Sequence, residues 1–126
     1  MSAVEQHARA HVVTDSTDYS TDSAAEEHTV PVALTYDPEA DPPIVRMTLP
    51  ASVGTVPGDW VFDRELLEKG LTAPAASGDI RIWPCGRVQA IVELHTASGV
   101  SLVQFDSQTL IRFLGRTYAA TAAVTH

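Results

Sequence analysis

The stretch Asp59–Pro84, DWVFDRELLEKGLTAPAASGDIRIWP, contains the signals of a strand, a helix and a second strand. Trp60–Phe62 is aromatic and β-branched, which suits the pleated, half-buried surface of a strand. Asp63 offers a side-chain oxygen to the free N–H groups of a first helical turn, and residues 64–69 are good helix formers. Gly70 is then expected to end the helix in the left-handed conformation that glycine readily adopts.

The second half of this stretch predicts a loop followed by a strand. Thr72–Gly78 is small, polar and proline-bearing, which is typical of a loop. Ile80–Trp83 has the alternation of a strand with one buried face. Pro84 lacks a backbone donor, so it is expected to close that strand or to mark a sheet edge.

Similar patterns predict further strands on both sides of this stretch. The first of them, Val4–Val13, is ambiguous in period, and we favour a strand over a helix. Pro31 points to an edge or early position within the second, and the turn residues 37–43 indicate a hairpin between the second and third. These expected strands are Val4–Val13, Thr29–Tyr36, Ile44–Leu49, Val88–Thr96 and Val100–Phe105.

A second helix is predicted at Ser107–Tyr118, with Asp106 as its cap. Its apolar positions recur at helical spacing and form one stripe. Gly115 interrupts the helix at a cost of about 1 kcal/mol relative to alanine, and we expect it to allow a neighbouring backbone to approach. Ala119–His126 is expected to fray. The stripe consists of Leu110, Phe113, Leu114 and Thr117.

Thr14–Thr29 is rich in acidic and hydroxyl side chains and poor in large apolar ones. Such a segment buries too little surface to offset its ordering entropy, so we expect an acidic mobile loop at 14–29 with a turn near 18–20. The whole pattern predicts one domain over 1–126. Its fold class is α+β, with about seven mainly antiparallel strands and two helices in the order strands, helix, strands, helix.

The composition narrows the function classes. The chain has 126 residues and a formal net charge of −8, which argues against nucleic acid as a partner because phosphate binding needs clustered Lys and Arg. Cys85 is the one cysteine, so no internal disulfide forms, and a reducing, cytoplasmic location is the expectation. We find no signal peptide and no apolar run that could span a membrane.

The motifs of catalysis and of metal or cofactor binding are not found in the sequence. No serine lies in Gly-x-Ser-x-Gly, and no phosphate-binding glycine loop is present. His7 and His11 lack a second pair at metal-ligand spacing, and His95 is interpreted as a surface residue. Glu65 and Glu68 are interpreted as part of a solvated helix face. We therefore predict no catalytic residue, no metal and no cofactor.

The aromatic residues and arginines leave two interpretations open. Trp60, Phe62 and Trp83 could stack nucleic-acid bases, although a core role is favoured because their strands carry the main apolar faces. The arginines could line a phosphate or carboxylate surface, or form ion pairs with nearby acidic side chains of Asp63, Asp79 or Glu65. The arginines in question are Arg64, Arg81, Arg112 and Arg116.

Several motifs together resemble the SsgA-like proteins of sporulating actinobacteria. They are WVFxRELLxxGL from Trp60 to Leu71, GDIRIWP from Gly78 to Pro84, and LxxFLxRT from Leu110 to Thr117. The resemblance covers roughly residues 30–118. It marks a set of residues as structural or partner-facing: Trp60, Phe62, Arg64, Leu67, Gly70, Leu71, Gly78, Asp79, Arg81, Trp83, Pro84, Phe113, Leu114 and Arg116.

The resemblance implies a non-enzymatic regulator of sporulation-specific cell division. Such a protein acts through protein–protein contacts to position or recruit septum machinery, namely the tubulin-like FtsZ, directly or through an SsgA-like paralogue. The implied fold is similar to the whirly proteins, with two antiparallel sheets, and the implied assembly is a homotrimer. The implied location is cytoplasmic, at the division septum, with peripheral membrane association through partners. The alternative is a single-stranded nucleic-acid-binding module on a whirly-like sheet.

Overall fold

The computed structural model describes residues 4–15, 27–39, 43–50, 58–96 and 99–124. Within these ranges the chain forms eight β-strands and two α-helices, in the predicted order of strands, helix, strands and helix. The elements are β1 (Val4–Asp15), β2 (Glu27–Tyr36), β3 (Ile44–Leu49), β4 (Gly58–Asp63), α1 (Arg64–Gly70), β5 (Ala75–Ser77), β6 (Ile80–Cys85), β7 (Gln89–Thr96), β8 (Gly99–Asp106) and α2 (Ser107–Val124).

All strands belong to one sheet with the order β4-β3-β2-β1-β8-β7-β6-β5. Every neighbouring pair is antiparallel. Two meanders, β1–β4 and β5–β8, are joined because the last residues of β1, His11–Asp15, pair with Val100–Gln104 of β8. The fold is therefore one continuous sheet rather than the two sheets that the family resemblance implied.

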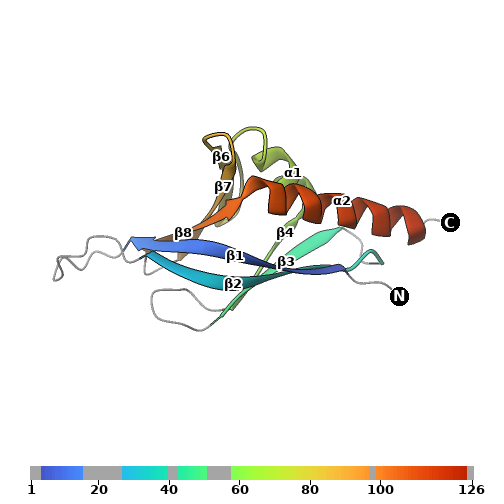
Figure 1. Ribbon diagram of the computed structural model, residues 1–126, viewed down its shortest axis with the longest axis horizontal. Coiled ribbons are helices and arrows are strands. Elements are labelled where there is room, and N and C mark those ends of the chain that lie inside the picture. The colour runs from blue at the N-terminus through green and yellow to red at the C-terminus, as the bar shows by residue number, and fades with distance from the viewer. Residues whose placement is uncertain (1–3, 16–26, 40–42, 51–57, 97–98, 125–126) are drawn as a thin grey trace.

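The sheet is strongly bent at this junction. Figure 1 shows β1, β2 and β3 running together, with β6 and β7 rising from the end of that layer. α2 continues directly from β8 and runs back along β1, and α2 contacts β1, β7 and β8. α1 contacts β4 near one end of the sheet and β5 and β6 at the other. The short helix thus brings the two ends of the sheet together, so the fold approaches a barrel.

The core lies between the inner face of the sheet and the two helices. Strand alternation places every second side chain there, as the buried residues Val45, Met47 and Leu49 of β3 show. α2 contributes its predicted apolar stripe, in which Phe113 and Thr117 have no exposed surface. α1 contributes Leu66 and Leu67 to this core. Tyr36 of β2 and Phe105 of β8 are also buried in it. The alternate side chains of the strands lie on the outer face of the sheet.

Several elements are longer than the sequence indicated, whereas β7 begins at Gln89, one residue later than the expected Val88, which lies in the turn before it. Thr14–Asp15 and Glu27–Thr29 are strand residues, so the loop expected at 14–29 is too long; the rest of it, 16–26, lies outside the described residues. β5 was missed because Ala-Ala-Ser carries none of the β-branched or aromatic residues that signal a strand. α2 extends to Val124, which corrects the expected fraying after Tyr118.

The two helix starts differ although both begin after an aspartate. Asp106 accepts a hydrogen bond from the backbone N–H of Gln108 at 3.2 Å, as a capping side chain should. Asp63 occupies the corresponding position at α1 but makes no side-chain cap bond. The backbone N–H of Arg64 is instead bound by the carbonyl oxygen of Pro43 at 3.2 Å. Tertiary structure therefore supplies the partner that the sequence assigned to the Asp63 carboxylate.

Both helical glycines differ from expectation. Gly70 is the last residue of α1 and is not left-handed; Leu71 follows it with right-handed dihedral angles. Glycine is needed at position 70 because a Cβ on this residue would lie 2.4 Å from the Cβ of Ile82 in β6. Gly115 was expected to admit a neighbouring backbone, but nothing lies within 4 Å of a Cβ at that position.

Both strand prolines lie where the ladder can do without an N–H donor. Pro31 is opposite Arg9 of β1, and β3 pairs with β2 only from Ala33 onwards, so Pro31 precedes the three-stranded part. Pro84 is paired with Ala90 of β7 and does not end β6, which continues to Cys85. The predicted strand-closing role of Pro84 is therefore one residue too early.

Candidate functional site

Many family-motif residues are core residues. Phe62, Leu67, Phe113 and Leu114 are buried, and Trp60 and Leu71 pack partly buried against the same core. Gly78 forms the turn between β5 and β6 with a φ of 60°, and the carbonyl of Asp79 accepts a hydrogen bond from the N–H of His95 at 2.9 Å. These residues build the core and the turn between β5 and β6, and their buried side chains offer little to a partner.

Arg64 connects α1 to β2 and α2. Its guanidinium lies 3.9 Å from the ring centroid of Tyr118 and 5.3 Å from that of Tyr36. Its Nη1 donates a hydrogen bond to the Tyr36 hydroxyl at 3.0 Å and another to the Thr121 hydroxyl at 3.1 Å. The ion pairs considered for this arginine from the sequence are not among its contacts. We call Arg64, Tyr36, Tyr118, Thr121 and Glu68 the helix junction.

Tyr118 completes the helix junction on the solvent side. Its hydroxyl donates a hydrogen bond to Oε1 of Glu68, so α2 is tied to α1 a second time. The bond to the Glu68 carboxylate, with burial and the negative charge of Glu68, raises the pKa of Tyr118 above its usual value of 10.0, while the positive charge of Arg64 opposes the shift. The phenol therefore stays protonated as a donor across the physiological range.

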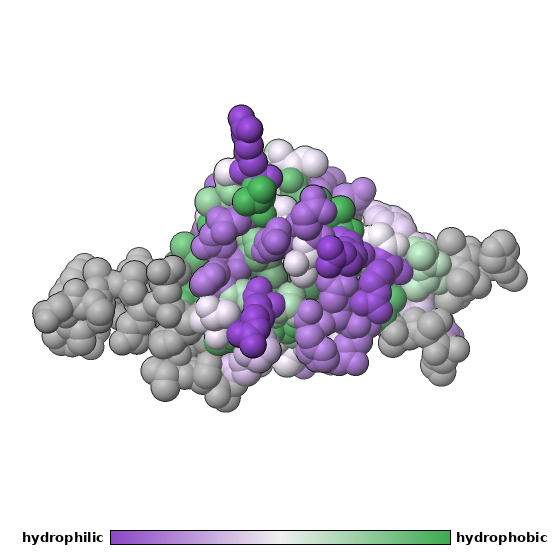
Figure 2. All heavy atoms as spheres, in the orientation of Figure 1, coloured by the Kyte–Doolittle hydropathy of each residue, from purple (hydrophilic) through white to green (hydrophobic). Residues whose placement is uncertain are grey.

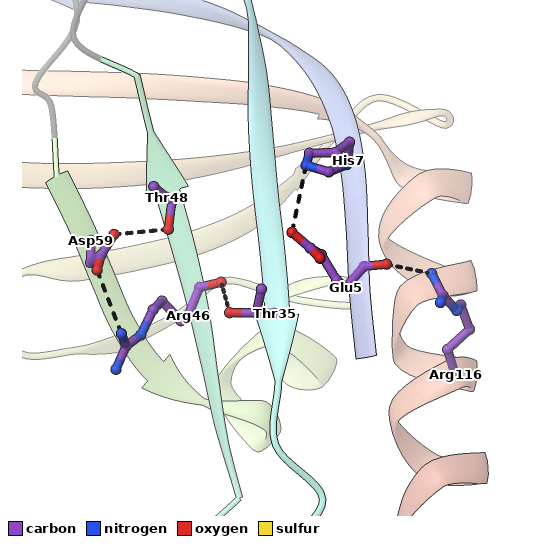
Figure 3. A network of polar contacts seen from close by, with 7 residues as sticks. All are labelled: Glu5, His7, Thr35, Arg46, Thr48, Asp59 and Arg116. Atoms are coloured by element: carbon purple, nitrogen blue, oxygen red, sulfur yellow. Dashed lines mark hydrogen bonds and ion pairs between the residues drawn. The ribbon is translucent and has the colours of Figure 1, made fainter. Parts of the chain in front are cut away.

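Arg116 fixes the other side of α2. Its Nη1 donates to the backbone carbonyl of Glu5 at 3.1 Å and to Oε1 of Gln6 at 3.2 Å. Figure 3 shows this arginine reaching from α2 to the start of β1. Of the four arginines considered in the sequence, Arg64 and Arg116 are therefore structural, and Arg112 is an exposed residue of α2.

Trp83 lies on the outer face of the sheet, so the core role favoured from the sequence is wrong for this residue. Ile82 is buried, and strand alternation turns Trp83 to the opposite face, where it is half-buried. There it stands opposite Ile91, with Leu102 on the same face of β8. We call Trp83, Ile91 and Leu102 the outer-face patch.

Charged and amide side chains border the outer-face patch. Arg81 is placed with its guanidinium 5.8 Å from the Trp83 ring centroid and stands opposite Glu93. His95 is exposed, which confirms its interpretation as a surface histidine, and its ring is hydrogen-bonded to Glu93. Tryptophan and arginine, which lie side by side here, are both enriched in protein interfaces.

A pocket of about 310 Å³ lies where β4 meets α1. Its residues come from β4, α1, α2 and the segment before β3, and three of them are carboxylates with one guanidinium among them. The pocket thus favours cationic groups. Its lining consists of Pro43, Asp63, Arg64, Glu65, Glu68 and Tyr118.

The sequence identified Arg64 and the solvated pair Glu65 and Glu68 but missed the aromatic half of the helix junction. Tyr36 was interpreted as one member of an alternating strand, and Tyr118 as the end of a helix. No local pattern brings these tyrosines to Arg64, because their meeting depends on α2 returning across the sheet.

Figure 2 views the molecule from the side on which α2 crosses the sheet, and hydrophilic residues dominate its middle with apolar residues between them. Within the described ranges, no group of His, Cys, Asp and Glu side chains could hold a metal ion. The helices of those ranges include none that is long and apolar enough to cross a bilayer.

Comparison with known proteins places the chain in a family. Residues 30–125 match the family described as Streptomyces sporulation and cell division protein, SsgA. The chain therefore belongs to the SsgA family, as its motifs indicated.

Similar proteins carry the name sporulation-specific cell division protein SsgB. The SsgB of Salinispora tropica is 39% identical over 97 residues, which cover 74% of this chain and 67% of that protein. The SsgB of Streptomyces coelicolor is 37% identical over 94 residues, which cover 72% of this chain and 67% of that protein. This family of cell-division regulators is not a known enzyme family.

Solved structures share the fold. One comes from a study of SsgB mutations that correlate to longitudinal cell division during sporulation of Streptomyces coelicolor; it is 29% identical, with a TM-score of 0.71 over 94% of this chain and 88% of that one. Another is an SsgA-like sporulation-specific cell division protein from Thermobifida fusca, with a TM-score of 0.76 over 94% of this chain and 81% of that one. The second, at 24% identity, supports the fold alone.

Proposed function

We propose that this protein is a non-enzymatic regulator of sporulation-specific cell division that acts through protein–protein contacts. In this role it positions or recruits septum machinery, with FtsZ as the partner, either directly or through an SsgA-like paralogue. It works in the cytoplasm at the division septum and reaches the septal membrane through its partners.

The observation that carries this proposal is the family match over residues 30–125, which includes both helices and seven of the eight strands. Relatives that share this part of the chain are named for sporulation-specific cell division. The outer-face patch supports the contact-based mechanism, because tryptophan is enriched at the centres of protein interfaces.

A binding experiment with purified FtsZ tests the proposal. Tagged protein is incubated with FtsZ alone and with FtsZ plus a purified SsgA-like paralogue, and co-sedimentation is measured. In parallel, a deletion strain is scored for sporulation septa and complemented with wild-type protein or the Trp83→Ala variant. We expect loss of septa on deletion and rescue by wild type. Normal septation together with no association in either mixture would overturn the proposal.

We also propose that the protein is a homo-oligomer, with the trimer favoured by its family. The outer-face patch supports this, since Arg81 and Glu93 border its apolar side chains, so a second copy could meet it with matched charges. Light scattering at micromolar concentration provides the test. A trimer mass is expected, and a monomer mass would exclude self-association under those conditions.

A second candidate function is single-stranded nucleic-acid binding, which the placement of Arg81 over Trp83 favours. A solvent-facing tryptophan beside an arginine can stack a base. The net charge of −8 opposes it. Binding to single-stranded DNA, measured over a series of salt concentrations, tests this candidate, because phosphate binding must strengthen at low salt. Absence of binding at low salt would remove this candidate.

A further inference from the structure

β4 is the last strand at one edge of the sheet, and its hydrogen-bond pattern can be assigned. The N–H of Arg64 donates to the carbonyl of Pro43, in register with the β3–β4 ladder. In an antiparallel pair, bonded and non-bonded residue pairs alternate. Phe62 and Trp60 are therefore bonded to β3, as Arg64 is.

The alternation directs the N–H and C=O groups of Asp59 and Val61, and the N–H of Asp63, away from β3. The carbonyl of Asp63 belongs to the first turn of α1, because Asp63 is the N-cap of that helix. Among the described residues no other strand lies beside this edge. Such an edge is a template for pairing with another chain, unless charged side chains, proline, a bulge or a covering segment protects it. β4, GDWVFD, contains neither lysine nor proline.

The side chains on the outer face of this edge differ in their exposure and in the contacts that they already make. Val61 is 44% exposed. Asp59 is turned toward β3, where it accepts a hydrogen bond from Thr48 at 2.8 Å and lies 3.6 Å from Arg46, as Figure 3 shows. Asp63 is exposed and makes no side-chain cap bond. The negative charge available to a partner is therefore concentrated at the Asp63 end of β4.

The pocket of about 310 Å³ continues the edge at that end, because Asp63 lines it together with Glu65 and Glu68. Arg64 is the cation of this lining, and its Nη1 is directed to the hydroxyls of Tyr36 and Thr121. A cationic side chain that arrives along β4 would meet the Asp63 carboxylate first. Behind it lie Glu65, whose Oε1 is 3.7 Å from Nζ of Lys69, and Glu68, which accepts the hydrogen bond of Tyr118.

We propose that the open edge of β4 binds an extended, basic segment of a partner protein by strand addition. The segment pairs antiparallel, as all strands of this sheet do. It places an apolar β-branched residue opposite Val61 and a lysine or arginine two positions earlier, opposite Asp63. A further basic residue before that one enters the acidic pocket.

Backbone pairing supplies the affinity of this mode, and the side chains supply the specificity. The proposal deepens the contact-based function by naming one surface and the chemistry of its partner. Its failure leaves the division role intact, because the FtsZ and septation experiments do not depend on which surface is used.

Peptide binding tests the proposal directly. The probe is acetyl-KKTVTT-amide, titrated into the full-length protein by calorimetry at low and moderate salt. One control, acetyl-KKTPTT-amide, keeps both charges but lacks the central N–H donor and cannot pair as a strand. The other, acetyl-EETVTT-amide, keeps the strand-forming residues and reverses the charge. We expect binding of the first peptide alone, with weaker binding as salt increases.

Variants of β4 make the test specific for its edge. Val61→Pro removes an outward-facing donor without removing a β3 bond, a position that an edge strand tolerates. It should weaken peptide binding about tenfold or more, because ladder bonds are lost. Val61→Thr keeps the donor and is the matched control, with binding within about twofold of wild type. Asp63→Asn removes the charge and keeps a residue suited to a helix start.

Amide hydrogen exchange gives an independent measurement. In the free protein the amides of Asp59, Val61 and Asp63 should exchange faster than those of Trp60 and Phe62, and the probe peptide should slow the first set. Equal binding of the proline peptide, unchanged affinity of Val61→Pro, or no change in exchange would overturn the proposal. A Val61→Pro variant that alters the oligomer mass while no peptide binds would also overturn it, by assigning the edge to a second copy.

Discussion

Gly70 of α1 lies directly against Ile82 of β6, so closely that a Cβ at residue 70 would stand 2.4 Å from the Cβ of Ile82 and 3.0 Å from its carbonyl oxygen. Gly70 is buried and Ile82 has no exposed surface. The contact brings the backbone of α1 onto the sheet and so sets the distance between the two ends of the sheet that α1 joins.

Gly70→Ala should therefore destabilise the protein. Overpacking of this kind costs about 1–3 kcal/mol, while alanine's better helix propensity would by itself add about 1 kcal/mol of stability. We expect a net loss, measured by urea unfolding. A variant as stable as wild type would show that α1 can move away from Ile82 without cost.

Gly115→Ala should have the opposite effect, which makes it the matched control for Gly70. Gly115 is exposed in the interior of α2, and nothing lies within 4 Å of a Cβ there. We expect a gain of about 0.5–1 kcal/mol in the free energy of unfolding from reduced backbone entropy and better propensity. A loss of stability in the same urea titration would contradict an open position at this residue.

Trp83 and Phe113 should differ in their contributions to stability. Phe113→Ala removes a ring with no exposed surface and should cost about 3–5 kcal/mol. Trp83→Ala removes a half-buried ring from the outer face and should cost about 1 kcal/mol. Thermal unfolding of both variants provides the measurement, and a cost for Trp83→Ala as large as that of Phe113→Ala would place the tryptophan in the core.

Arg64→Lys should weaken the attachment of α2. Lysine keeps the charge but loses the planar fork that stacks on Tyr118 and donates to Tyr36 and Thr121. We expect a loss of about 1–2 kcal/mol. Arg112→Lys, on the exposed face of α2, is the control and should change stability by about 0.5 kcal/mol or less. Equal effects of the two substitutions would remove the specific role of the helix junction.

The Tyr118–Glu68 bond should make stability decrease at high pH. Because the pKa of Tyr118 is raised in the folded state, its contribution is fully present below the unfolded value of 10.0 and is lost as pH increases through the higher folded value. The stability difference between wild type and Tyr118→Phe should therefore stay constant near neutral pH and decrease above pH 10. Tyrosinate absorbance, compared between the two proteins, should show a phenol titrating above the ordinary range; titration at the ordinary value would contradict the bond.

The sequence predicted where both helices begin and that α1 ends at Gly70, but it did not always predict the interactions responsible. Asp106 and Asp63 carry the same local signal, and only the first caps its helix through its side chain. The difference arises because Pro43 already binds the N–H of Arg64. Similarly, Gly70 was expected from local backbone geometry, whereas its requirement comes from Ile82 on another strand.

Several residues of the outer-face patch and the helix junction could be identified from the sequence, but their spatial arrangement could not. Local alternation contained the information that Trp83 shares a face with Arg81, yet a core position was favoured because its strand carries one of the main apolar faces. The helix junction could not be found from the sequence, because Arg64, Tyr36 and Tyr118 come from three separate segments. The outward-facing groups of β4 likewise depend on its place at the end of the sheet.

The α+β fold class, most strands and both helices, and the family could all be predicted from the amino-acid sequence. Hydrophobic alternation, turn residues and the WVFxRELL and GDIRIWP motifs are properties of short stretches of chain. Contacts in the folded chain were needed to establish that the two meanders join through β1 and β8, that α1 contacts both ends of the sheet, and that β4 is the end strand of the sheet formed by the described residues. Those features arise from contacts between distant segments, whose free energies no single stretch of chain contains.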